Sequence, residues 1–365
     1  MLRRSYGRLA RLAGDGGLLP PYRMQFELTY RCNQRCSHCF QRRIADDEGR
    51  RLPAGELPAH EWIGLAQQVP AFTLITLTGG EPLAHPEFFR ILEGVGAIRR
   101  VNLLSNALLL DDRLIDLCLR THTLLIGSAL MGDREIHDRI TCVPGSYDAS
   151  IQRLDALQRA KRKVGRRYPL LDIKMTVTAE NFGCVETIIS QAVKLDADFV
   201  TFSLEYDNPV KMNPFLTQTL DDPSYEKVHY FGPLEDRGLR AEFAKLFSSL
   251  VRRGSAGRTR FRFYPAFRDP ELTEDYFLNA ERYYGKMLPC FDPWGCLIIT
   301  PQGRVYPCLS YEVGSVIDSS LKQVWRSERF ARFRALIRER GTLPACWGCC
   351  YVDPDLSAFD PSAGR

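Results

Sequence analysis

The 365-residue chain has no stretch of about 18 uncharged apolar residues, so the sequence predicts no membrane-spanning helix. It also has little net charge: the formal charge is +5, and residues 1–23 alone hold five arginines and one aspartate. A broad basic surface for nucleic acid is therefore not expected. The apolar stretches of the basic N-terminal arm are too short for a secretory signal, so we expect a cytoplasmic protein with reduced thiols.

Cysteine, by contrast, is abundant, and its placement is the strongest signal in the sequence. Nine of the 12 cysteines fall in two windows: Cys32, Cys36 and Cys39, then Cys290, Cys296, Cys308, Cys346, Cys349 and Cys350. In a secreted chain an even count could form disulfides, but clustering with adjacent cysteines favours metal ligation. Cys118 and Cys184 lie in helical stretches and are expected to be buried apolar residues.

Between the two windows, β-rich runs alternate with helical patterns. The expected strands are 24–29, 72–78, 100–105, 122–129, 170–177 and 198–204, and the expected helices are 58–68, 86–95, 112–120, 147–162 and 182–194. This alternation predicts an α/β fold, a partial (β/α)6 barrel of parallel strands whose active site lies at the carboxyl ends of the strands.

The expected domain organisation follows from the same reading. A basic arm (1–21) precedes the barrel (22–205), and a connecting loop or cap with a helix near 237–252 fills residues 206–285. A small cysteine-rich α+β module (286–355), with a helix near 328–340, and a short tail (356–365) complete the chain.

The first motif is Cys32-x3-Cys36-x2-Cys39, directly after the first expected strand. Three thiolates on one tight loop can hold three irons of a 4Fe-4S cluster and leave the fourth iron open to a small molecule with amino and carboxylate groups. The alternative is a structural zinc loop with His38 as fourth ligand, but zinc normally takes paired spacings.

The second motif is the segment Thr78-Gly79-Gly80-Glu81-Pro82 at the end of the second strand. Two glycines would let a ligand approach the backbone, and the Glu81 carboxylate could hold an ammonium group. Because both motifs follow parallel strands, they are expected at the same mouth of the barrel.

Together, "CNQRCSHCF" and "TGGEP" resemble the radical S-adenosylmethionine (radical SAM) superfamily over residues 22 to about 205. The resemblance implies a 4Fe-4S cluster on the first three cysteines, S-adenosylmethionine (SAM) on the open iron, and its ammonium group at Gly79, Gly80, Glu81 and Pro82. It further implies reductive cleavage of SAM to a 5'-deoxyadenosyl radical that abstracts a hydrogen from the substrate.

Four softer positions complete the implied SAM site. Phe40 matches an aromatic residue near the adenine, and Ser105, Asn106 and Ser128 resemble polar positions near the nucleoside and methionine. For Ser105 and Asn106, an ordinary turn at the end of a strand is an equal alternative.

The C-terminal window resembles the SPASM/Twitch auxiliary-cluster domains. Cys290-x12-Gly303-x4-Cys308 matches their opening signature, Cys346-x2-Cys349 supplies a further pair, and "ITPQGRVYPC" predicts a β-hairpin with a Gln-Gly turn. These four cysteines are expected to hold one auxiliary 4Fe-4S cluster, the Twitch form, with Cys296 and Cys350 as alternative ligands. A zinc ribbon is the other interpretation, since zinc favours Cys-x2-Cys pairs.

The resemblance implies an oxidoreductase in which the substrate radical is oxidised through the auxiliary cluster. The substrate would be a small molecule or a peptide, and the electron donor a protein such as flavodoxin or ferredoxin. One alternative is a redox-neutral epimerase or isomerase with Cys142 as hydrogen donor. Another is a non-catalytic metal-cluster scaffold, which has no use for an ammonium-binding turn beside an open iron.

Overall fold

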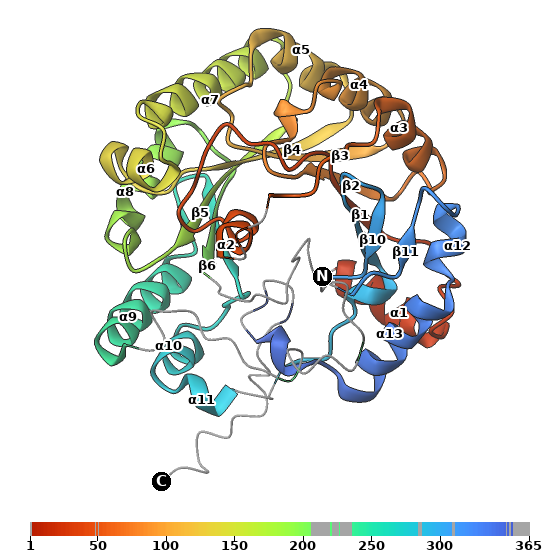
Figure 1. The fold of residues 1–365 in the computed structure, drawn as a ribbon. Coiled ribbons are helices and arrows are strands. Elements are labelled where there is room, and N and C mark those ends of the chain that lie inside the picture. The colour runs from red at the N-terminus through yellow and green to blue at the C-terminus, as the bar shows by residue number, and fades with distance from the viewer. Residues whose placement is uncertain are drawn as a thin grey trace.

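The computed structural model describes residues 2–47, 49, 51–205, 220, 226, 236–283, 287–308, 311–347, 349 and 352. All six expected strands are present, in parallel and in sequence order, so the predicted partial barrel is confirmed (Figure 1). The strands are β1 (Arg23–Glu27), β2 (Leu74–Thr78), β3 (Arg100–Ser105), β4 (Thr123–Ala129), β5 (Leu170–Val177) and β6 (Phe199–Leu204).

The described sheet extends beyond these six strands at both edges. On one side β8 (Thr259–Tyr264) pairs in parallel with β6, and β7 (Ser255–Ala256) follows antiparallel to β8. On the other side β9 (Cys296–Ile299) pairs in parallel with β1, followed by β10 (Arg304–Tyr306) and β11 (Gly314–Ser315). The predicted hairpin at the Gln-Gly turn is therefore β9–β10, and it continues the barrel sheet directly.

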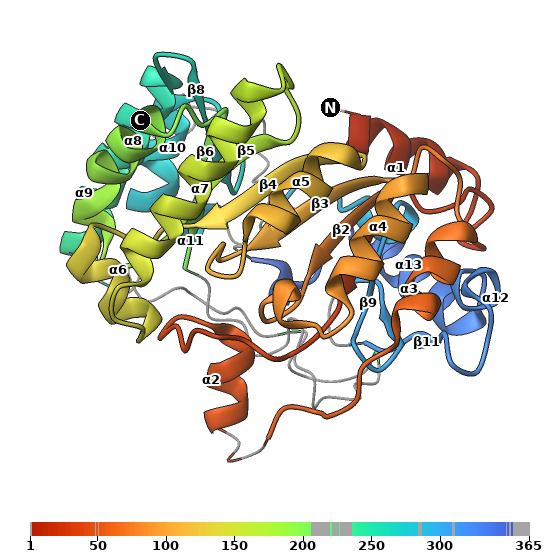
Figure 2. The same ribbon diagram turned by 90° about the horizontal axis from the view of Figure 1, so that it is seen from above.

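Helices cover the outer face of the curved sheet (Figures 1 and 2). Those between the strands are α3 (Ala59–Gln67), α4 (Phe88–Ile98), α5 (Asp112–Arg120), α6 (Arg134–Thr141), α7 (Ser146–Lys163) and α8 (Val185–Lys194). Helix α2 (Phe40–Asp47) lies apart from this layer, at the mouth of the barrel. After β6 come α9 (Arg237–Arg253), α10 (Pro270–Leu278), α11 (Ala280–Tyr283), α12 (Leu321–Trp325) and α13 (Glu328–Arg340). The expected helices near 237–252 and 328–340 are thus α9 and α13, whereas most of the expected loop 206–235 lies outside the described residues.

The alternation of side chains along each strand separates the core from the site. On β1, Met24 and Phe26 are fully buried against the helix layer, while Gln25 and Glu27 face the barrel interior and line its cavity. On β5, Ile173 and Met175 are likewise buried, and Lys174 lines the cavity. Because successive strand residues point to opposite faces, one apolar layer carries the packing and leaves the interior free for polar groups.

The N-terminal arm forms helix α1 (Leu2–Leu12) and packs on the C-terminal region. The Arg338 guanidinium donates to the Asp15 carboxylate at 2.7–3.0 Å and to the Arg11 carbonyl oxygen at 2.5 Å. Trp294 Nε1 donates to Asp15 Oδ1 at 3.1 Å, and the Arg11 guanidinium lies 5.6 Å from the Trp294 ring centre. The arm is therefore part of the fold around the C-terminal cysteines.

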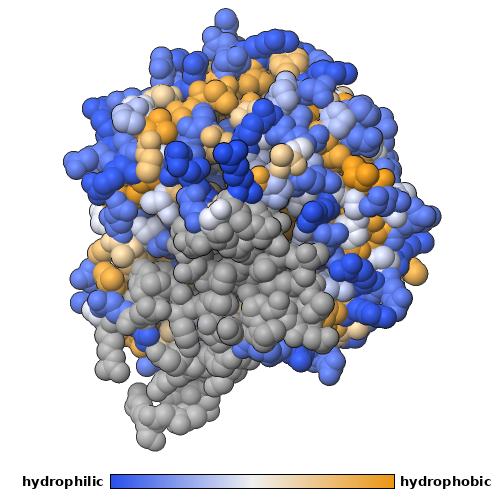
Figure 3. Space-filling view, in the orientation of Figure 1, coloured by the Kyte–Doolittle hydropathy of each residue, from blue (hydrophilic) through white to orange (hydrophobic). Residues whose placement is uncertain are grey.

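No helix in the part of the chain that the structure describes is long and apolar enough to cross a membrane. On the face shown in Figure 3, the described residues are mostly hydrophilic, with hydrophobic areas between them.

Candidate active site

The first three-cysteine motif lies on the loop that follows β1, at the mouth of a cavity of about 560 Å³. Cys32, Cys36 and Cys39 all line this cavity. The loop is held locally: the Gln34 backbone N–H donates to Cys32 Sγ at 3.4 Å, and the Cys39 N–H donates to the Cys36 carbonyl oxygen at 3.1 Å. The sequence motif thus becomes a compact group of thiols facing one space.

The electrostatics of these thiols fit a metal cluster. Burial, with smaller contributions from the neighbouring cysteines of the loop, raises the pKa of Cys32 to about 11 and that of Cys36 to about 12. Several thiolates can share so small a volume only with a cation among them, and iron supplies that charge. The donor set and its surroundings therefore fit a 4Fe-4S cluster on Cys32, Cys36 and Cys39.

The two glycines after β2 are required by close packing of the backbone. A Cβ atom at Gly79, whose φ is +146°, would lie 2.3 Å from the Thr29 carbonyl oxygen, and one at Gly80 would lie 2.5 Å from that of Arg31. The Gly80 N–H donates to the Thr29 oxygen at 2.7 Å, and the Glu81 N–H donates to the Arg31 oxygen at 2.8 Å. The glycines let the segment press against the cysteine loop, a role that the sequence argument about ligand access did not include.

The Glu81 carboxylate is buried and bound by protein donors. It accepts hydrogen bonds from Ser105 Oγ at 2.8 Å, from the Asn106 N–H at 2.7 Å and from the Leu83 N–H at 3.0 Å. Burial raises its pKa to about 7 despite these bonds. Glu81 therefore fixes the end of β3 beside the end of β2, and it lies at the edge of the cavity.

Ser105 and Asn106 also line the cavity and connect it to the cysteine loop. Asn106 Nδ2 donates to Asn33 Oδ1 at 2.7 Å, which joins the turn after β3 to the loop between Cys32 and Cys36. The Asn106 carbonyl oxygen accepts from Ser150 Oγ at 3.0 Å. Three segments that are distant in sequence are thus held around one space.

Three of the sequence-derived site residues lie elsewhere. Ser128 is fully buried between Gly127 and Ala129, which line the cavity, so its side chain points to the opposite, helix-covered face. Pro82 is buried in the turn after Glu81 and does not line the cavity. Cys142 is exposed at the C-terminus of α6, beside the cysteine loop, where it contributes to the raised pKa of Cys36, but it does not line the cavity. For Phe40, the structure describes only the start of α2, not the side chain.

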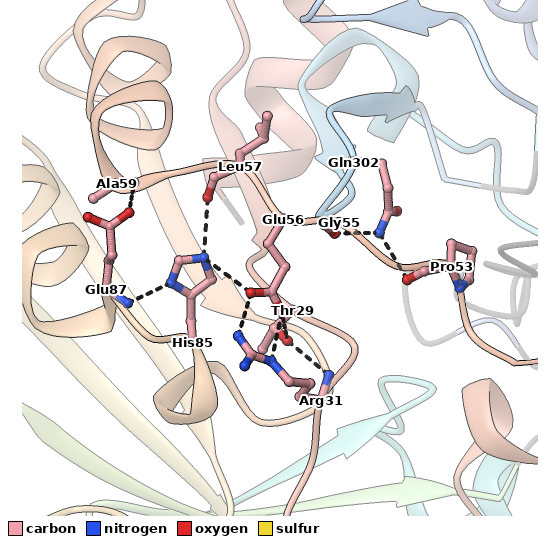
Figure 4. A network of polar contacts seen from close by, with 10 residues as sticks. All are labelled: Thr29, Arg31, Pro53, Gly55, Glu56, Leu57, Ala59, His85, Glu87 and Gln302. Atoms are coloured by element: carbon pink, nitrogen blue, oxygen red, sulfur yellow. Dashed lines mark hydrogen bonds and ion pairs between the residues drawn. The ribbon is translucent and has the colours of Figure 1, made fainter.

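A polar network braces the cysteine loop from behind (Figure 4). The Glu56 carboxylate accepts hydrogen bonds from Thr29 and Arg31 and lies 3.8 Å from His85 Nε2. His85 Nε2 is also 3.2 Å from the Leu57 carbonyl oxygen. On the other side of Glu56, Gln302 of the β9–β10 turn donates to the Gly55 carbonyl oxygen at 2.9 Å. The segment around Glu56 therefore links the cysteine loop to the β9–β10 hairpin.

Sequence reasoning missed four charged residues that line the cavity, of which Glu27 on β1 and Lys174 on β5 lie within strands; the other two are Arg42 and Glu205. Glu27 is 4% exposed, and burial raises its pKa to about 7. The Lys174 ammonium lies 3.1 Å from Asp172 Oδ2, and its alkyl chain crosses Gly127, where a Cβ would lie 2.7 Å from Lys174 Cε. A charged residue within an expected strand, on the face opposite the apolar one, is the signal that could have found both.

Three of the C-terminal cysteines, Cys290, Cys308 and Cys346, lie near one another. Burial raises the pKa of Cys290 well above its usual range, and the neighbouring Asp292 carboxylate and the Cys308 and Cys346 thiols raise it further. The Cys349 N–H donates to the Cys346 carbonyl oxygen at 3.0 Å.

Of these cysteines, Cys308 lines the same cavity as the first motif. Cys296 starts β9 opposite Arg23, while Cys350 lies outside the described residues. None of the cysteines that the structure describes forms a disulfide. Of the two remaining cysteines, Cys118 is buried as expected, whereas Cys184 is only half-buried.

Comparison with known proteins identifies two families in the chain. The model of the radical SAM superfamily matches residues 26–191, and that of the SPASM iron-sulfur cluster-binding domain matches residues 290–350. The AdoMet-dependent heme synthase of Methanosarcina barkeri is 23% identical over 334 residues, which are 89% of this chain and 88% of the relative.

Two solved structures share the fold at low sequence identity. Streptococcus suis SuiB bound to the precursor peptide SuiA has a TM-score of 0.61 at 15% identity and covers 91% of this chain and 70% of SuiB. Native anSMEcpe with bound AdoMet has a TM-score of 0.59 at 17% identity, over 86% of this chain and 83% of that one.

Both family matches coincide with the cysteine windows and with the two halves of the site described above. The chain therefore belongs to the radical SAM superfamily, as a radical SAM enzyme with a C-terminal SPASM domain, and its cofactors are a 4Fe-4S cluster with SAM and at least one auxiliary iron-sulfur cluster.

Proposed function

We propose that this enzyme oxidises its substrate by two electrons, through the removal of one hydrogen atom, one electron and one proton. The bound cluster and SAM supply the 5'-deoxyadenosyl radical that takes the hydrogen atom. The single observation that carries the proposal is that Cys308 of the SPASM region and the three cysteines of the first loop line the same cavity of about 560 Å³.

The chain's own residues divide into three groups in this proposal. Cys32, Cys36 and Cys39 hold the catalytic cluster, and Gly79, Gly80, Glu81, Ser105 and Asn106 form the SAM side of the cavity. Cys290, Cys308, Cys346 and Cys349 hold one auxiliary cluster, with Cys296 and Cys350 as alternative ligands. The domain boundaries at 22–205 and 286–355 belong to the same proposal.

Glu27 is the proton acceptor in this proposal. Its carboxyl group faces the cavity and receives one described hydrogen bond, a long one of 3.4 Å from Gln25 Nε2, whereas Glu81 is bound by three donors. A carboxyl group with a pKa of about 7 can accept a proton near neutral pH. It therefore suits a substrate carbon that bears a hydroxyl or amine.

The atoms and electrons of this oxidation balance. With its cofactors bound, the enzyme would pass the substrate C–H hydrogen to 5'-deoxyadenosine, and the auxiliary cluster held by the C-terminal cysteines would accept one electron. The O–H or N–H proton would pass to Glu27. A C=O or C=N bond forms in the product. The cavity volume suits a small molecule or one side chain of a peptide, and relatives with this fold include a structure bound to a precursor peptide.

The test is anaerobic turnover of the reconstituted enzyme with SAM and dithionite. Candidate substrates are small metabolites and the peptides that are encoded beside the gene. A substrate should raise 5'-deoxyadenosine formation and give a product lighter by two hydrogen atoms, in equal amounts. Release of an epimer of unchanged mass would instead support the redox-neutral alternative, which the exposed position of Cys142 outside the cavity disfavours. Bound zinc without any SAM cleavage would contradict both.

A further inference from the structure

A second cavity, of about 570 Å³, lies at the other end of the barrel, where β5, β6 and β8 begin. Its walls are the end of α7 with the loop that follows, the loop before β6, and the β7–β8 hairpin. The catalytic cavity lies towards the carboxyl ends of the strands and reaches Lys174 on β5, so about four residues of that strand, roughly 13 Å, separate the two cavities. The second cavity is therefore not part of the catalytic site.

The lining of this cavity is strongly basic. It contains six basic side chains and two carboxylates, an excess of four positive charges: Lys161, Arg162, Arg166, Arg167, Arg258 and Arg260, with Asp196 and Asp198. Among the described residues, no ion pair within 4.0 Å involves Lys161, Arg258 or Arg260. Most of this charge is therefore available to a ligand.

Lys161 is the least exposed of these cations. The residue is 7% exposed. Burial lowers the pKa of its ammonium group, whereas the charges of Asp198 and Asp196 act to raise it. An anion bound in the cavity would stabilise this buried ammonium group, because a buried charge without a counter-charge carries a large free-energy cost.

Hydrogen bonds between the three walls fix the shape of the cavity. Gln158 Nε2 on α7 donates to the Leu195 carbonyl oxygen at 2.9 Å, and the Leu171 N–H donates to Asp198 Oδ2 at 2.9 Å. The Arg260 N–H of the hairpin donates to the Asp198 carbonyl oxygen at 3.1 Å. The cations are thus presented by braced backbone segments, which lowers the entropic cost of binding a ligand.

The helix dipole explains only some of these cations. Lys161 and Arg162 lie in the last turn of α7, where positive charge is favourable without any ligand. Arg258 and Arg260 come from the β7–β8 hairpin, and Arg260 borders β6 rather than a helix end. Their convergence with Lys161 on one concave space requires a different explanation.

We propose that this cavity binds a small phosphate-bearing molecule. Arginine guanidinium groups match phosphate oxygens in pairs, and the volume lies within the range of small-molecule sites. The two carboxylates in the lining can accept hydrogen bonds from hydroxyl groups of such a ligand, and they disfavour an extended polyanion. A small phosphate ester with hydroxyl groups therefore fits the cavity better than nucleic acid or an acidic protein surface.

The experiment is isothermal titration of the reconstituted enzyme with inorganic phosphate, pyrophosphate and ATP, with adenosine as the phosphate-free probe. At least one phosphate probe should bind, with an affinity that falls as salt is added. Arg258→Ala with Arg260→Ala should weaken this binding by about tenfold or more. The matched double variant, Lys163→Ala with Arg252→Ala, removes two exposed cations outside the cavity. It should change the affinity for the phosphate probe by less than about twofold.

Further measurements separate the other outcomes. Both double variants should keep the thermal midpoint and the basal formation of 5'-deoxyadenosine, because their residues are exposed and distant from the catalytic cavity. Poly-glutamate and a short DNA duplex serve as the acidic-protein and nucleic-acid probes. Binding of either one without any phosphate probe, equal loss in both double variants, or no binding at all would overturn the proposal.

Discussion

The two cysteine groups of this enzyme are built in opposite ways. Cys32, Cys36 and Cys39 lie within eight residues of one loop, which is held by local hydrogen bonds and by bonds to the end of α6 and to Asn106. The C-terminal group spans Cys290 to Cys349 and is brought together by a hairpin, helix α13 and the turn at Pro344–Cys346. A local group needs little loop-closure entropy, whereas the dispersed group depends on the surrounding fold and on its metal.

The most severe test of this difference removes the local group. Replacing Cys32, Cys36 and Cys39 by Ala should abolish formation of 5'-deoxyadenosine, because no ligands remain for the catalytic cluster. About 4 iron atoms per chain should stay bound in the C-terminal region, as one 4Fe-4S cluster requires. Iron analysis and chromatography of the nucleoside measure both, and continued SAM cleavage would falsify the assignment.

The complementary change attacks the dispersed group. Cys290→Ala should remove about 4 iron atoms and lower the thermal midpoint, because metal binding there contributes to folding, while basal SAM cleavage persists. Cys296→Ala is the matched control and should retain the iron. If Cys296→Ala loses a whole cluster instead, the ligand set is wrong, and about 12 iron atoms in the unmodified protein would mean two auxiliary clusters.

Backbone packing behind the local group gives the next effect. Gly79→Ala should destabilise the apoprotein by about 2–4 kcal/mol, since its Cβ would meet the Thr29 carbonyl oxygen at 2.3 Å in a left-handed conformation. Gly64→Ala on α3, with no atom within 4 Å of the new Cβ, should instead add about 0.5–1 kcal/mol. Urea denaturation followed by circular dichroism compares the two variants, and equal midpoints would refute the packing argument.

Glu27 lies on β1, between the two cysteine groups, and its ionisation makes the free energy of unfolding depend on pH. Its pKa is about 7 in the folded protein and 4.5 for an exposed glutamate, so the folded state keeps a proton that the unfolded state releases. Stability therefore falls as pH rises from about 4.5 to 7 and is then constant. Glu27→Gln should be more stable than the parent at pH 8 by up to about 3 kcal/mol and equal to it at pH 4.5.

The same Glu27→Gln variant should also form less oxidised product per 5'-deoxyadenosine. Urea midpoints at the two pH values measure its stability, and chromatography measures the product ratio. A variant that gains stability at pH 8 yet keeps full coupling of product to 5'-deoxyadenosine would remove Glu27 from the chemistry while leaving its burial intact.

The smallest effect concerns the clamp between the N-terminal arm and the dispersed group. Arg338→Ala should cost about 1–2 kcal/mol, because Arg338 and Asp15 are paired but partly exposed. When a chelator is added, iron should leave the C-terminal site faster than in the parent protein. The rate of iron loss from the loop of Cys32, Cys36 and Cys39 should not change. Arg332→Ala, which removes an exposed ion pair on the same helix, is the control, and equal effects in the two variants would show that the clamp is not specific.

Comparison of the expected and observed elements shows which signals survive in a sequence. The six barrel strands and five of the helices between them were predictable because each has its own apolar pattern, whereas α2 and α6 were not expected. Strand β8 was missed because Arg260 and Arg262 alternate with its apolar residues. Of these two, Arg262 is paired with Asp172 and lies over the Phe199 ring on neighbouring strands.

The site divides along the same line. The sequence by itself determined the cluster loop, because the spacing of Cys32, Cys36 and Cys39 is a local property, and it determined the alternation that makes a barrel. Only the tertiary structure decided that Ser128 faces the helices, that Glu27 lies in the cavity, and that Cys308 joins it. These outcomes depend on strand register and on pairing between β1 and β9, interactions across more than 250 residues that no local pattern encodes.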